Sequence, residues 1–266
     1  MMNGNDVLLH LSEITGGSWE AIAEHIRSRT PLTAEDVEST RKKVPTPFIT
    51  FLDMENGKYP EDFREVARPP FVLYYQGNLE LIAKREKCVA IIGSREASPY
   101  GLSMARKLSE DLAKNGYTVV SGLAKGVDAA ALEAAVPYGK AVGVLGNGLG
   151  KYYPTINKEL QKRIASQGLL LTEYPYDTPP EAKNFPSRNR IIAFLSSIVV
   201  VAEAKPRSGT LLTVAFAIDA GRDVGAVPYR ADEESACNRL IQDGAAMILS
   251  AEDVMYQIQS PRNGEK

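Results

Sequence analysis

Three short segments of the chain each place a cationic side chain beside glycines and the start of an expected helix. Their sequences are GSREASPYG (93–101), SGLAKGVD (121–128) and KPRSGT (205–210), with the cations Arg95, Lys125 and Arg207. Glycine lets the backbone turn sharply, and the free N–H groups at a helix start attract anions. One such segment is as often a plain turn. Three of them on one sheet edge predict a site for a phosphate-bearing ligand.

The octapeptide KNFPSRNR (183–190) is the most distinctive segment, because it carries three cations and no acid. Lys183, Arg188 and Arg190 surround Phe185. Arginine offers a planar fork that matches phosphate, and an exposed aromatic ring between cations can stack on an unpaired base. A structural alternative stays open. In it Phe185 packs on the following helix, and the arginines pair with acids at strand ends, Glu173 or Glu203.

Several kinds of catalytic site are excluded. The only histidines, His10 and His25, lie in the first 30 residues, so the rest of the chain cannot hold a Ser-His-Asp triad or a histidine metal site. Cys88 and Cys237 are far apart and form no C-x-x-C, which excludes a disulfide framework and a structural zinc site. We expect no metal and no cofactor. The acids that could serve catalysis are Asp128, Glu173 and Glu203, and nothing pairs them.

The stretch LGNGLG (145–150) looks like a dinucleotide motif, but its spacing is G-x-G-x-G and it runs into KYYP instead of a helix. No G-x-x-x-x-G-K-[ST] stretch occurs, so a P-loop nucleotidase is excluded as well.

Composition indicates a globular protein, with 44% hydrophobic and 24% charged residues. The formal net charge is −2, which argues against nucleic-acid binding by bulk charge and leaves room for a local basic stripe. No apolar run approaches 18 residues, and the N-terminal segment lacks the features of a secretory signal. We therefore expect no membrane association and a cytoplasmic location.

The elements that must position these residues divide the chain near residue 45. Residues 1–45 read as a small all-helical domain, with Ser18 and Thr33 as expected N-caps. Residues 46–85 form a connector with two strands of its own, FITFLD and FVLYYQG. From Cys88, apolar runs of strand length alternate with helical segments, which is typical of a parallel sheet covered on both faces. We predict an α/β protein with an extended Rossmann-like, doubly wound domain over 46–260 and a polar tail, 261–266.

At these motifs the sequence resembles the DNA-processing protein A family (DprA/Smf). The agreement runs from about Phe48 to Val254. It includes IIGSREASPYG, VVSGLAKGVDAAA, GVLGNGLGKYYP, LLLTEYP, NFPSRNRIIAFLS, VVVAEAKPRSGTLLTVAFAIDAGRDVGAVP and CNRLIQDGA.

The resemblance implies a non-enzymatic protein that binds incoming single-stranded DNA, protects it and helps to load the recombinase RecA in natural transformation. It also implies a homodimer. The DNA-binding residues that we predict are Arg95, Ser121, Gly122, Lys125, Lys183, Asn184, Phe185, Arg188, Arg190, Arg207, Ser208 and Gly209. Many members carry a C-terminal winged-helix-like domain, which we do not expect here because the chain ends soon after its last expected helix.

Two further points stay open. A Rossmann-like nucleotide-monophosphate phosphoribohydrolase, or another nucleotide-binding enzyme, is the alternative function, although PRSGTLLTV has Val214 where those enzymes have a glutamate. For the dimer, the last helices offer Leu240, Ile241, Val254, Met255 and Ile258. Of these we expect Met255 and Ile258 to be exposed.

Overall fold

Runs of aliphatic residues from Cys88 onward form the parallel strands of one sheet, as the sequence predicts. The computed structural model describes residues 3–260, and the predicted tail 261–266 lies outside the described residues. The strands are β1 (Phe48–Thr50), β2 (Val72–Gly77), β3 (Cys88–Gly93), β4 (Thr118–Ser121), β5 (Ala141–Val144), β6 (Leu169–Thr172), β7 (Ile198–Glu203), β8 (Asp223–Ala226) and β9 (Ala246–Met247). Their order across the sheet is β1-β2-β6-β5-β4-β3-β7-β8-β9.

The connector predicted over residues 46–85 is part of this sheet. Strand β1 pairs antiparallel with β2, and β2 pairs antiparallel with β6. The other strand pairs are parallel. The α/β, Rossmann-like fold class is therefore confirmed, and the sheet is mixed at one edge.

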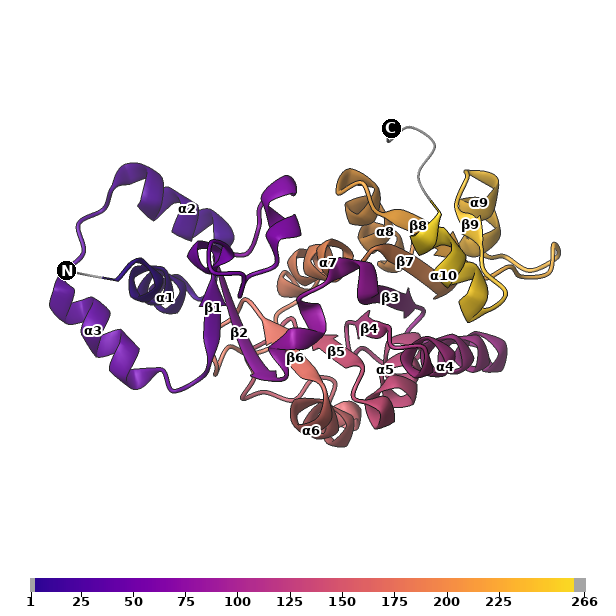
Figure 1. Ribbon diagram of the computed structural model, residues 1–266, viewed down its shortest axis with the longest axis horizontal. Helices are drawn as coiled ribbons and strands as arrows, with labels where there is room; N and C mark the ends of the chain where they lie inside the picture. Colours follow the sequence, from indigo (N-terminus) through magenta and orange to yellow (C-terminus); the bar gives the residue numbers. More distant parts are fainter. Residues whose placement is uncertain (1–2, 261–266) are drawn as a thin grey trace.

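Helices cover both faces of the sheet (Figure 1). They are α1 (Gly4–Thr15), α2 (Trp19–Ser28), α3 (Ala34–Lys43), α4 (Pro99–Lys114), α5 (Val127–Ala135), α6 (Lys158–Gln167), α7 (Asn184–Leu195), α8 (Thr210–Asp219), α9 (Ala236–Gln242) and α10 (Ala251–Gln259). Alternate residues of β3 point to opposite faces: Val89 and Ile91 pack with α4, α5, α6 and α10, whereas Ala90 and Ile92 pack with α7, α8 and α9. Two apolar cores, one on each face, hold the sheet in place.

The N-terminal helices α1, α2 and α3 lie at the β1–β2 edge of the sheet, and β8, β9 and α10 lie at the opposite end (Figure 1). The expected N-caps are confirmed, because Ser18 accepts from the backbone N–H of Ala21 and Thr33 from that of Asp36. The Tyr74 hydroxyl on β2 donates to Glu13 on α1 at 2.7 Å, which joins the helices to the sheet. The domain boundary at residue 45 stays a prediction.

Parallel pairing places the carboxyl ends of β3, β4, β5 and β7 at one edge of the sheet. Ligands of open α/β sheets bind at this edge. Between residues 3 and 260, no helix combines the length and the apolar character that crossing a membrane requires.

Candidate functional site

A pocket of about 260 Å³ opens at the carboxyl ends of β3, β4 and β5. It brings together residues from two of the three predicted loops and from the first turns of α7. The residues that matter chemically are Arg95, Gly122, Lys125, Tyr153, Phe185 and Arg188. We call this the α7 pocket.

Two exposed cations stand at the mouth of the α7 pocket. Arg95 and Lys125 are exposed, and neither forms an ion pair with any residue in the described part of the chain. One acid, Glu96, also lines the pocket. The positive charges outnumber the negative, so the pocket favours an anion.

An aromatic pair forms one wall of the pocket. The rings of Phe185 and Tyr153 have centroids 5.2 Å apart and are tilted by 37°. Gly146 lies against the Phe185 ring so closely that a side chain at this position would meet it at 2.7 Å. The guanidinium carbon of Arg95 lies 6.0 Å from the ring centroid of Phe185, within cation–π range. Phe185 is thus half-buried and in contact with Tyr153 and Arg95, so its ring is less exposed than the sequence suggests, and base stacking on it stays a prediction.

Arg188 is only 4% exposed, although the sequence predicts that it contacts DNA. Its Nη1 donates to the carbonyl of Gly122 at 2.5 Å and to that of Val144, so this nitrogen is taken by the backbone at the ends of β4 and β5. Burial lowers the pKa of the Arg188 guanidinium to about 10, and the nearby Asp128 carboxylate opposes this effect. Arg188 therefore belongs to the wall and base of the pocket.

The loop after β4 is held from several sides. Asp128 accepts from the backbone N–H of Gly122 at 3.2 Å, and burial raises the pKa of its carboxyl. Asn157 donates to the carbonyl of Leu123 at 2.9 Å. Leu123 has a φ of 55°, a left-handed conformation that costs a non-glycine residue of the order of 1–3 kcal/mol. The surrounding contacts hold the loop in this conformation beside Lys125.

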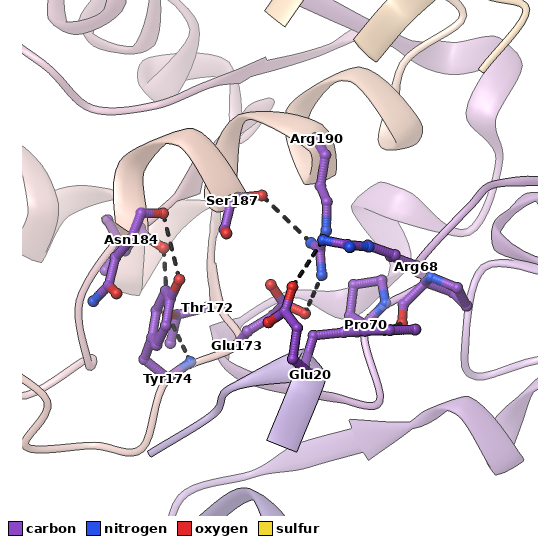
Figure 2. A network of polar contacts seen from close by, with 12 residues as sticks. Glu20, Arg68, Pro70, Thr172, Glu173, Tyr174, Asn184, Ser187 and Arg190 are labelled. Carbon is purple, nitrogen blue, oxygen red and sulfur yellow. Dashed lines mark hydrogen bonds and ion pairs between the residues drawn. The ribbon is translucent and has the colours of Figure 1, made fainter. Parts of the chain in front are cut away.

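Arg190 lies beside Glu173, Glu20 and Arg68 (Figure 2) and does not line the α7 pocket. Its Nη2 forms an ion pair of 2.6 Å with Glu173, and both side chains are almost fully buried. The pairing that the structural alternative describes is therefore present for Arg190, and we do not include this residue among the proposed DNA contacts.

A larger cavity of about 790 Å³ lies on this other side of α7, next to α2. Its charges are largely balanced, since Glu20 pairs with Arg68 as Glu173 does with Arg190. We therefore place no anion site there.

Other predicted residues lie outside the α7 pocket. Ser121 is buried and its hydroxyl donates to the Ile91 carbonyl at 2.6 Å, so it serves the β3–β4 pairing. Asn184 is buried and lines the larger cavity instead. We therefore do not include Ser121 and Asn184 among the proposed DNA contacts. Lys183 is exposed and forms an ion pair of 2.8 Å with Glu181.

The third predicted loop follows β7. Arg207 and Gly209 in this loop are exposed, and Ser208 is half-buried. The loop lies at the same sheet edge without lining the α7 pocket. Arg207 adopts a φ of 62°, again in the left-handed region.

The start of α4, predicted as an anion site, already holds a carboxylate. Glu203, at the end of β7, accepts from the backbone N–H of Ser98 at 2.9 Å and from its hydroxyl at 2.5 Å. The Tyr229 hydroxyl donates to the same carboxylate at 3.0 Å. The helix N-terminus is therefore occupied, and Arg95 is the part of this loop that remains available.

Sequence reasoning missed Tyr153 and Asn147. Tyr153 forms one wall of the pocket together with Phe185, and Asn147 donates to the carbonyl of Lys151 at 3.0 Å, which shapes the loop that carries Tyr153. The signal was the aromatic pair in KYYP after a glycine-rich turn, at the end of a buried strand.

Comparisons with known proteins agree with this architecture. The family model of DNA recombination-mediator protein A matches residues 50–259. The chain is 44% identical over 228 residues to the DNA processing protein DprA of Streptococcus pneumoniae, covering 85% of this chain and 79% of that protein. It is 39% identical over 254 residues to the protein Smf of Synechocystis, covering 93% of this chain and 63% of Smf. The chain therefore spans less than two thirds of that relative.

Two solved structures are similar over most of the chain. The structure of DNA processing protein A from S. pneumoniae has a TM-score of 0.76 and 34% identity, and the match covers 97% of this chain and 94% of that one. The structure of DNA processing protein A from Helicobacter pylori, which concerns a single-stranded DNA binding mode, has a TM-score of 0.72 and 31% identity. That match covers 81% of this chain and 96% of that one.

Proposed function

The chain belongs to the DNA recombination-mediator protein A family, and from this we propose that it binds single-stranded DNA in the α7 pocket. One observation carries the proposal. Two exposed and unpaired cations, Arg95 and Lys125, flank an aromatic wall of Phe185 and Tyr153 at the ligand-binding edge of the sheet. The cations suit phosphates, and the aromatic wall suits a base.

The aromatic wall explains why the preferred DNA is single-stranded. A base can reach the rings of Phe185 and Tyr153 only when it leaves its own stack, and a paired base resists this. The single-stranded DNA binding mode described for the H. pylori protein supports this choice.

The biological role that we propose is the one that the family resemblance implies. The chain protects incoming single-stranded DNA in natural transformation and helps to load RecA on it, in the cytoplasm. The S. pneumoniae and Bacillus subtilis relatives, both named DNA processing protein DprA, support the DNA-processing part of this role.

We propose that this role is not enzymatic. The alternative, a phosphoribohydrolase, needs a carboxylate near the start of the helix after β7. Val214 stands there, buried in α8. The binding proposal accounts for the exposed cations of the pocket without a catalytic group.

We also propose a homodimer formed through the C-terminal end of the sheet. Met255 and Ile258 are half-buried against the protomer's own core, so they are not the exposed residues that the sequence predicts. The exposed apolar side chains of this region are Met247, Leu249 and Tyr256. Strand β9 is the edge of the sheet here, and an unpaired edge beside apolar side chains suits self-association.

A competition experiment tests the binding proposal. A labelled oligothymidylate is bound to the protein and displaced either by an unlabelled single strand or by a blunt duplex of equal length. We expect the single strand to compete at a much lower concentration. Equal competition by the duplex, or hydrolysis of a nucleotide monophosphate by the protein, contradicts the proposal.

A further inference from the structure

Two oppositely charged side chains hold the backbone at Gly122, one through its N–H group and the other through its carbonyl group. Asp128 accepts from the Gly122 N–H at 3.2 Å and from the Ala124 N–H at 3.4 Å. Arg188 donates to the Gly122 carbonyl at 2.5 Å and to that of Val144. The carboxylate and the guanidinium make no direct ion pair, so each acts on the backbone and attracts the other across it.

The absence of a side chain at Gly122 makes this arrangement possible. A Cβ atom there would lie 2.6 Å from Nη1 and from Nη2 of Arg188, which is closer than any real contact of this kind. The guanidinium therefore lies directly against the backbone of the loop that leads to Lys125. Its Nε donates to the side chain of Asn189 at 3.1 Å, so a second nitrogen is also engaged within the protein.

Arg188 also connects this loop to the aromatic wall. Its guanidinium carbon lies 5.9 Å from the centroid of the Phe185 ring, and both residues belong to the first turns of α7. One side chain thus touches the end of β4, the end of β5 and the ring that faces Tyr153.

We propose that Arg188 is a positioning residue and not a phosphate contact. With Asp128 it fixes the ends of β4 and β5, so that Lys125, Arg95 and Phe185 face one nucleotide at the same time. This inference rests on the proposed binding of single-stranded DNA. The opposite buried charges of Arg188 and Asp128 largely cancel at the pocket mouth. The exposed cations Arg95 and Lys125 are therefore the groups that attract phosphate.

Salt dependence separates a positioning residue from a contact. Each phosphate neutralised on a single strand adds about 0.7 to the slope of log K against log salt concentration. We would measure binding of oligothymidylate over a range of salt concentrations for the wild type and for Arg188→Gln, Arg188→Lys and Lys125→Gln. Arg190→Lys serves as the matched control, because Arg190 is an equally buried arginine on the same helix that faces away from the pocket.

We expect Arg188→Gln to lower affinity about tenfold, as loss of hydrogen bonds from a charged donor does. The slope should fall by less than the value of about 0.7 for one phosphate contact, because the Asp128 carboxylate that loses its partner is buried. Lys125→Gln should reduce the slope by about 0.7. Arg188→Lys keeps the charge but not the planar fork, so it should restore only part of the affinity. Arg190→Lys should bind as the wild type does.

Two results would contradict the positioning role of Arg188 without contradicting the proposed function. A fall in slope for Arg188→Gln equal to that for Lys125→Gln makes Arg188 a contact, and wild-type affinity of Arg188→Gln makes it a residue of the core only. If the wild type does not bind oligothymidylate at all, the proposed function fails, and the positioning role fails with it. Amide hydrogen exchange of residues 122–125 in the free protein gives an independent check, since Arg188→Gln should accelerate it and Arg190→Lys should not.

Discussion

Arg190 and Glu173 form an ion pair of 2.6 Å in which the two side chains are 6% and 7% exposed. Breaking such a pair from one side leaves an uncompensated buried charge, and this costs about 3–5 kcal/mol. We therefore expect Arg190→Ala to lower the free energy of unfolding by that amount, measured by urea denaturation.

A double variant controls for the pair itself. Replacing both charges with apolar residues of similar volume is often neutral, so Arg190→Met combined with Glu173→Leu should recover most of the lost stability. The salt slope of DNA binding should be the same in the folded double variant as in the wild type. A changed slope would indicate that Arg190 contacts DNA.

The different positions of the Arg188 and Arg190 side chains show how far the sequence could predict the site. Both belong to a cationic octapeptide, and the sequence predicts the helix that holds them. With 3.6 residues per turn, side chains two positions apart point in nearly opposite directions. One therefore faces the α7 pocket and the other the larger cavity, and the local sequence does not say which.

Loops at strand ends were predictable because the apolar runs locate the strands and parallel strands end at one edge. Which side chains contact the residues of those loops depends on segments that are distant in the sequence. Glu203 reaches Ser98 across 105 positions, and the β1–β2 hairpin joins the sheet through β6, almost a hundred residues later. No period or motif of the local sequence records such pairs. For the same reason the buried Ser121 and Asn184 could not be distinguished from exposed polar residues.

Removing the Phe185 ring should weaken DNA binding. Stacking of one base on an aromatic side chain is worth about 1–3 kcal/mol, so Phe185→Ala should cost that amount of binding free energy. The loss should be larger for the single strand than for a duplex, which cannot offer an unpaired base. Tyr153→Ala is the matched variant, since it removes the partner ring, and it should show the same preference in fluorescence anisotropy titrations. Equal losses for both kinds of DNA would contradict base stacking at this wall.

Charge reversal at Arg95 should change the salt dependence of binding. The lost phosphate contact removes about 0.7 from the slope of log K against log salt, and the new repulsion reduces it further. Arg207→Glu is the control, because Arg207 is exposed at the same sheet edge but does not line the α7 pocket. We expect the smaller change for Arg207. An unchanged slope for Arg95→Glu would exclude Arg95 from the interface.

The buried carboxyl of Asp128 should make stability depend on pH. Burial raises its pKa in the folded protein above the value of 3.8 that it starts from, and the attraction of Arg188 only partly opposes this. The folded state therefore holds the proton more tightly than the unfolded state. The contribution of this group to the free energy of unfolding falls as pH rises through the raised pKa.

Asp128→Asn removes that contribution. The stability of the variant relative to the wild type should rise as the pH increases above about 4, measured by urea denaturation at each pH. A stability difference that does not change with pH, or one that changes in the opposite direction, would contradict a raised pKa at Asp128.

The exposed apolar side chains beside β9 should decide the oligomeric state. Met247 and Leu249 are 54% and 53% exposed, on the edge strand and just after it, and charge at these positions should disrupt a symmetric apolar contact. The protomer mass is 29.0 kDa, so light scattering at micromolar concentration should report twice that mass for the wild type. For Met247→Glu combined with Leu249→Glu it should report the protomer mass. Because two protomers on one strand raise the effective concentration of the second site, the variant should also lose affinity for long single strands more than for short ones. A monomeric wild type, with or without DNA, would contradict both expectations.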